Sequence, residues 1–158
     1  MQVLFICTGN IFRSLTAEYA LKAALTQTQD IAVSSAGTED YPHVVWPVVR
    51  DYLREKGLDV SRHARRTLTR QILDGADLAV AMSTDHQAFV RAQFAREIPL
   101  YTEVCGLPPA PLLDVGEAVP DYATNLDVGH AHMRRIIDQI VDLSSSLATR
   151  LRTSPQTL

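Results

Sequence analysis

The apolar run at residues 2–6, QVLFI, constrains the fold most, because a polar loop follows it directly. An apolar run without polar alternation is typical of a strand that is buried on both faces of a parallel sheet. Three further short segments are also expected to be strands, and the second of the four ends in a Ser/Gly loop. The expected strands are therefore residues 2–6, 30–38, 77–82 and 98–101.

Segments with helical periodicity separate these strands, and a proline-rich loop is expected over residues 103–124. The alternation predicts an α/β fold of three layers, in which a central four-stranded parallel sheet has helices on both faces. We expect one domain over residues 1–150 and a flexible tail over 151–158. The expected helices are residues 14–27, 47–56, 70–75, 84–95 and 125–150.

Cysteine content and charge limit the classes of function. Cys7 and Cys105 have no paired spacing, which excludes a disulfide scaffold and a cysteine zinc site and indicates a reducing compartment. The net charge of −3 argues against nucleic acid or an anionic membrane as a partner. The N-terminal apolar run is too short for a signal peptide, and a membrane span needs about 20 apolar residues. We therefore expect a cytoplasmic protein.

Arg13 lies at the predicted start of the first helix, where a cation opposes the helix dipole at a cost of about 0.3–1 kcal/mol. An enclosed anion offsets that cost, since backbone N–H groups, the dipole and the guanidinium can hold it together. Gly9 and Asn10 tolerate the unusual backbone that points the loop's N–H groups inward. The loop is therefore predicted to bind an anion such as phosphate.

Cys7 ends the first strand at the base of this loop. The same positive field favours a thiolate, and the Ser14 hydroxyl can donate to the sulfur. A thiolate below a bound phosphate is a nucleophile directed at phosphorus. The alternative is a buried cysteine that acts only as a small apolar residue. A Walker-type loop is excluded because no Gly-Lys-Ser/Thr follows.

The segment CTGNIFRS, residues 7–14, followed by TAE, resembles the signature of the low molecular weight protein tyrosine phosphatases. The resemblance extends over most of the chain. It includes VSSAGTEDY at 33–41, HARRTLT at 63–69, DLAVAM at 77–82 and VPDYATN at 119–125. The resemblance implies the fold of that family.

The resemblance also implies site residues. Cys7 would attack phosphorus to form a phosphocysteine, and Arg13 would hold the equatorial oxygens through the transition state. Asn10 would support the loop by hydrogen bonds to Ser35 and to the ring of His63. The implied phosphate-binding loop consists of Thr8, Gly9, Asn10, Ile11, Phe12 and Ser14.

A late loop would supply the general acid, which protonates the leaving oxygen and then activates the water. Asp121 in VPDY is the first candidate and Asp114 the second. Tyr41 and Tyr122 fall where the family places the aromatic walls of its substrate cleft, although simple loop packing is the alternative for both.

Two departures from the family pattern stand out: Phe12 replaces a common second cysteine, and Tyr122 follows Asp121 directly where the family's acid loop has Asp-Pro. The implied function is hydrolysis of phosphotyrosine proteins or small aryl phosphates, with inorganic phosphate as product and no metal or cofactor. Three alternatives stay open. An arsenate reductase on this fold needs more cysteines, and a phosphoarginine phosphatase carries threonine where this chain has Ile11. A catalytically weak phosphate-binding relative is the third.

Overall fold

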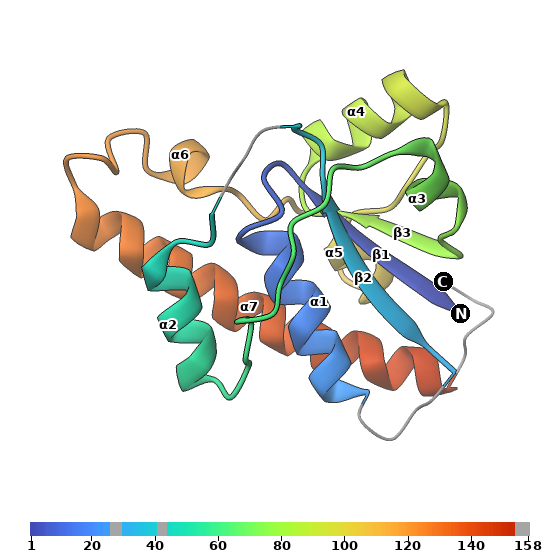
Figure 1. Cartoon of the computed structure of the whole chain (residues 1–158), viewed down its shortest axis with the longest axis horizontal. Helices are drawn as coiled ribbons and strands as arrows, with labels where there is room; N and C mark the ends of the chain where they lie inside the picture. The colour runs from blue at the N-terminus through green and yellow to red at the C-terminus, as the bar shows by residue number, and fades with distance from the viewer. Residues whose placement is uncertain (26–29, 41–43, 154–158) are drawn as a thin grey trace.

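The computed structural model describes residues 1–25, 30–40 and 44–153. Its sheet is parallel and has the order β2-β1-β3, so β1 lies in the centre (Figure 1). Cys7 pairs with Gly37, and Ile6 pairs with Ala81, so the carboxyl ends of the strands meet at one edge. The strands are β1 (Gln2–Cys7), β2 (Ala32–Gly37) and β3 (Leu78–Ala81).

Helices cover both faces of the sheet, and the side chains of β1 alternate between two apolar clusters. Phe5 packs on the face covered by α1, α2 and α7, whereas Ile6 packs on the face covered by α3 and α4 (Figure 1). The α/β class with a parallel sheet is thereby confirmed. The helices are α1 (Arg13–Ala24), α2 (Pro47–Glu55), α3 (Arg70–Asp74), α4 (Thr84–Phe94), α5 (Tyr101–Val104), α6 (Val115–Ala118) and α7 (Leu126–Thr153).

The prediction of a fourth strand is wrong for the described residues. Residues 98–101 form a single parallel bridge, between Leu100 and Ala81, and Tyr101 already begins α5. Pro99 has no N–H for a ladder. The N–H of Leu100 donates instead to the Glu103 carboxylate at 2.7 Å, which caps α5. The segment is apolar because it is buried, not because it extends the sheet.

The predicted long loop contains the short helices α5 and α6. Helix α7 continues to Thr153, so residues 151–153, expected in the tail, are helical, and residues 154–158 lie outside the described residues. Within the described ranges, no helix is long and apolar enough to cross a membrane.

Candidate active site

The loop after β1 curls at the carboxyl edge of the sheet before α1 begins at Arg13. Asn10 has a left-handed backbone with φ of 55°, which an asparagine tolerates. Gly37 packs against the loop so closely that a Cβ there would lie 2.6 Å from the Thr8 carbonyl oxygen. Among the described residues, no hydrogen-bond acceptor faces the backbone N–H groups of residues 9–12. Unpaired N–H groups at a helix N-terminus favour an anion.

The sulfur of Cys7 lies 2.9 Å from the Ser14 hydroxyl oxygen. Asn10 Nδ2 donates to that same oxygen at 3.0 Å. The amide donation uses one acceptor position of the Ser14 oxygen and leaves the Ser14 hydroxyl proton free to donate to the sulfur. Cys7 is buried, with 2% of its surface exposed. The buried Cys7 sulfur therefore lies beside a hydroxyl group and near the start of α1.

Asn10 links the loop to two neighbouring segments. Its Nδ2 donates to Ser35 Oγ at 2.7 Å, and Ser35 Oγ in turn donates to Glu18 at 2.5 Å. The His63 ring contacts the Asn10 backbone carbonyl through Nε2 at 2.9 Å, rather than the side chain. Burial lowers the pKa of His63 below its ordinary value. The loop conformation is therefore held by residues of β2 and of the 63–69 segment.

Arg13 reaches from the start of α1 to residues 112–117 and is 2% exposed. Its Nη1 donates to the Leu112 carbonyl at 2.9 Å, and its Nη2 donates to Asp114 at 2.5 Å. Glu117 Oε2 lies 3.5 Å from Nη1. The Nε atom of Arg13 is buried without a hydrogen-bond partner among the described residues. A buried donor without a partner costs about 1–3 kcal/mol, which a bound anion can recover.

A pocket of about 150 Å³ opens at the Cys7 sulfur. Apolar side chains and one carboxylate are therefore among the groups around Cys7. The lining residues are Cys7, Thr8, Gly9, Ile11, Phe12, Trp46 and Asp114.

The two candidate acids occupy different places. Asp114 lines the pocket and pairs with Arg13. Asp121 is exposed in the turn before α7, where its backbone carbonyl accepts from the Asn125 N–H at 3.0 Å, and it does not line the pocket. The Tyr122 ring lies 6.5 Å from that of Trp46, between centroids, and Tyr41 lies outside the described residues.

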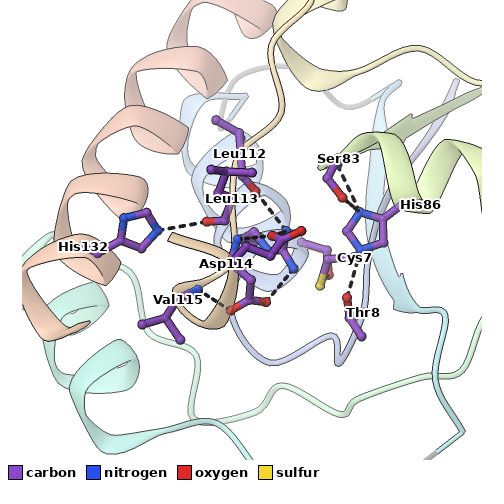
Figure 2. Close-up of polar contacts among 12 residues, drawn as sticks. Cys7, Thr8, Ser83, His86, Leu112, Leu113, Asp114, Val115 and His132 are labelled. Atoms are coloured by element: carbon purple, nitrogen blue, oxygen red, sulfur yellow. Dashed lines mark hydrogen bonds and ion pairs between the residues drawn. The ribbon is translucent and has the colours of Figure 1, made fainter. Parts of the chain in front are cut away.

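Two histidines that the sequence analysis did not select approach the site from opposite sides (Figure 2). His132 on α7 contacts the Leu113 carbonyl through Nε2 at 3.0 Å, next to Asp114. His86 on α4 contacts the Thr8 hydroxyl through Nε2 at 3.0 Å. The pattern Ser83-x-x-His86 at a helix start is a capping signal that could have drawn attention to His86.

Sequence reasoning also missed Trp46 and Glu117. Trp46 precedes α2, and only tertiary packing brings it to the pocket. Glu117 accepts from the Asp114 N–H at 2.5 Å and caps the short helix α6. In the part of the chain that the structure describes, no group of three or more His, Cys, Asp or Glu side chains could hold a metal ion.

His86 predicts a pH dependence of stability. Burial and the nearby Arg13 charge lower its pKa from 6.5 to about 3, so the native ring is neutral while the unfolded ring takes up a proton below about pH 6.5. Stability is therefore lost as pH falls from about 6.5 towards 3. We expect His86 to reduce the free energy of unfolding by about 2 kcal/mol at about pH 5.

Urea unfolding at about pH 7.5 and about pH 5 checks this effect of His86. The His86→Asn variant should lose less stability between the two pH values than the wild type. His63 is present in both proteins, so its own contribution cancels in the comparison. An equal loss in both proteins would contradict the assignment to His86.

A model of the family described as low molecular weight phosphotyrosine protein phosphatase matches residues 2–156. A protein-arginine-phosphatase of Bacillus subtilis is 34% identical over 98 residues, which is 61% of this chain and 65% of that protein. An arsenate reductase of Staphylococcus aureus is 36% identical over 83 residues, which is 52% of this chain and 60% of that protein. Each of these two alignments covers less than two thirds of the relative.

Among solved structures, a low molecular weight protein tyrosine phosphatase from T. tengcongensis is similar, with a TM-score of 0.77. It is 28% identical, and the match covers 96% of this chain and 99% of that chain. The family model and the structural match both extend over nearly the whole chain. The chain therefore belongs to the low molecular weight phosphotyrosine protein phosphatase family.

Proposed function

We propose that this chain is a phosphatase that hydrolyses aryl phosphate monoesters, above all phosphotyrosine, through a phosphocysteine on Cys7. One observation carries the proposal. Cys7 and Asp114 line one small pocket, and the Arg13 guanidinium forms an ion pair with Asp114. A nucleophile and an acid in one pocket, with a cation paired to that acid, are the groups that phosphoryl transfer needs.

In the first step the Cys7 sulfur forms a bond to phosphorus while the bond to the leaving oxygen breaks. Asp114 gives its proton to that oxygen, and the alcohol leaves. In the second step a water oxygen attacks phosphorus while Asp114 takes one of the water's protons. The S–P bond breaks, which releases inorganic phosphate and restores the thiolate. Arg13 and the unpaired loop N–H groups stabilise the charge on the phosphoryl oxygens in both steps.

The walls of the pocket support an aromatic leaving group. Ile11, Phe12 and Trp46 give it apolar sides, and Trp46 has Tyr122 as an aromatic neighbour. A flat phenyl ring gains from burial between such side chains. The assignment of Tyr41 to the cleft wall stays a prediction.

The similarity to a protein-arginine-phosphatase favours phosphoarginine as the second candidate substrate. Two peptides of one sequence, one carrying phosphotyrosine and one phosphoarginine, separate the candidates. We expect kcat/KM to be at least about tenfold higher for phosphotyrosine, since a methylene-scale difference in pocket fit already gives about 10–200-fold discrimination. A preference for phosphoarginine would overturn the proposed substrate class and leave a phosphatase. Thioredoxin-dependent reduction of arsenate would instead support the reductase alternative.

We propose Asp114 as the general acid in preference to Asp121, because only Asp114 lines the pocket. Asp114→Asn is expected to lower kcat on phosphotyrosine by about 10²–10³-fold. The loss should be smaller on p-nitrophenyl phosphate, since p-nitrophenolate leaves readily without a proton. Asp121→Asn is the matched control for charge and size, and its effect should not depend on the leaving group. If Asp121→Asn alone shows that dependence, Asp121 is the acid.

A further inference from the structure

The Thr8 hydroxyl and the His86 ring form a contact between the phosphate loop and α4 that the mechanism above does not use. Thr8 follows Cys7 directly and lines the same pocket. Its Oγ1 lies 3.0 Å from His86 Nε2, and His86 is 3% exposed. Thr8 and His86 lie on the opposite side of the site from residues 112–115 (Figure 2).

The partners of His86 determine which ring nitrogen carries the proton. The Ser83 backbone N–H donates to Nδ1 at 3.0 Å, and a backbone N–H can act only as a donor. Nδ1 is therefore an acceptor, and the single proton of the neutral ring is on Nε2. The low pKa of about 3 agrees with a ring that stays neutral at working pH.

The Nε2–H group of His86 must then donate to Thr8 Oγ1. The Thr8 oxygen is the acceptor in this bond, so the hydroxyl proton of Thr8 is left to donate elsewhere. Within the described ranges, the Thr8 hydroxyl has no other hydrogen-bond partner. The space beside it is the pocket at the Cys7 sulfur.

We propose that the Thr8 hydroxyl donates a hydrogen bond to an oxygen of the phosphoryl group bound at Cys7, and that His86 is the positioning residue that orients this hydroxyl. The proposal rests on the proposed function for the identity of the anion. It adds one side-chain donor to the loop N–H groups and Arg13. A hydrogen bond to a charged oxygen is stronger than a hydrogen bond between neutral groups.

Two substitutions at His86 separate this role from helix capping. Asparagine places an acceptor near the position of Nδ1, so His86→Asn keeps a partner for the Ser83 N–H and loses the donor to Thr8. Glutamine places a donor near the position of Nε2, so His86→Gln keeps the donor to Thr8 and weakens the cap. If His86 has only a structural role, phosphate affinity should fall in His86→Gln, which weakens the cap. If His86 orients the Thr8 hydroxyl, phosphate affinity should fall in His86→Asn, which loses the donor to Thr8.

The experiment measures the binding of inorganic phosphate by the fluorescence of Trp46, which lines the pocket and is the single tryptophan of the chain. Thr8→Val should weaken phosphate binding by about tenfold, the size expected for a hydrogen bond to a charged group. Thr8→Ser should bind like the wild type because it keeps the hydroxyl. His86→Asn should weaken binding by about three- to tenfold, and His86→Gln should restore it.

The double variant Thr8→Val/His86→Asn should bind phosphate no more weakly than Thr8→Val, because His86 acts through the hydroxyl. Equal binding by Thr8→Val and wild type, or multiplied losses in the double variant, would overturn the proposal. If the His86 variants do not fold, the comparison of Thr8→Val with Thr8→Ser decides it. Binding is measured without turnover, so a wild type that binds phosphate but hydrolyses no ester would refute the proposed function and leave this comparison intact.

Discussion

Replacement of Cys7 by serine is expected to lower hydrolysis of p-nitrophenyl phosphate by about 10⁴-fold or more, the scale seen when a catalytic nucleophile is removed. In the proposed mechanism the Cys7 sulfur, 2.9 Å from the Ser14 hydroxyl oxygen, is the atom that attacks phosphorus. A serine hydroxyl in the same place stays protonated and has no base beside it among the described contacts. Binding of inorganic phosphate should persist, because Arg13 and the loop N–H groups are unchanged.

Cys105→Ser is the matched control for this prediction. Cys105 is also buried, but its sulfur donates to the Leu143 carbonyl at 3.4 Å, and it does not line the pocket. Burial raises the pKa of the Cys105 thiol to about 12, so it stays protonated and unreactive. Steady-state rates of the three proteins check the prediction. An active Cys7→Ser variant, or equal losses in both variants, would contradict the role of Cys7.

Arg13→Lys is expected to lower kcat by about 10³-fold on the same substrate, the lower end of the range for arginines that stabilise phosphoryl transfer. Arg13 uses one guanidinium to contact the Leu112 carbonyl and Asp114, and its buried Nε has no hydrogen-bond partner among the described residues. A lysine ammonium is a single point and cannot hold both groups and two phosphoryl oxygens together. The loss should therefore appear in kcat as well as in KM.

Arg96→Lys is the control for Arg13→Lys, since Arg96 also donates to two separate groups with one guanidinium. It donates to the Leu73 carbonyl at 2.6 Å and to the Ala76 carbonyl at 2.9 Å, and it does not line the pocket. We expect Arg96→Lys to lower the midpoint of unfolding with little change in kcat. A kcat for Arg13→Lys near that of Arg96→Lys would contradict the role of Arg13.

The loop was predictable because its information is local. Cys7, Gly9, Asn10 and Arg13 lie within seven consecutive residues, between an apolar strand and a helix. Each residue type there has a physical reason that does not depend on the rest of the fold. The same holds for the parallel sheet, since a continuous apolar run such as that of β1 is typical of burial on both faces.

The approach of Asp114 to Arg13 was not predictable in this way. Asp114 lies 101 residues from Arg13 in sequence, and its approach depends on how residues 112–117 fold. Sequence spacing says nothing about the contact of His132 with Leu113 or the cap of α6 by Glu117, which hold that segment. The fourth strand fails for a related reason, since apolar character reports burial and does not separate one bridge at Leu100 from a strand.

In the proposed mechanism the phosphoryl group passes through a covalent bond to the Cys7 sulfur. The most direct measurement is mass spectrometry of the enzyme quenched in acid during turnover of p-nitrophenyl phosphate, followed by digestion. In the wild type we expect one phosphoryl group on the peptide that contains Cys7. In Cys7→Ser we expect no phosphoryl group on that peptide. A wild type that turns over substrate with no phosphoryl group on Cys7, or with the group on another residue, would contradict it.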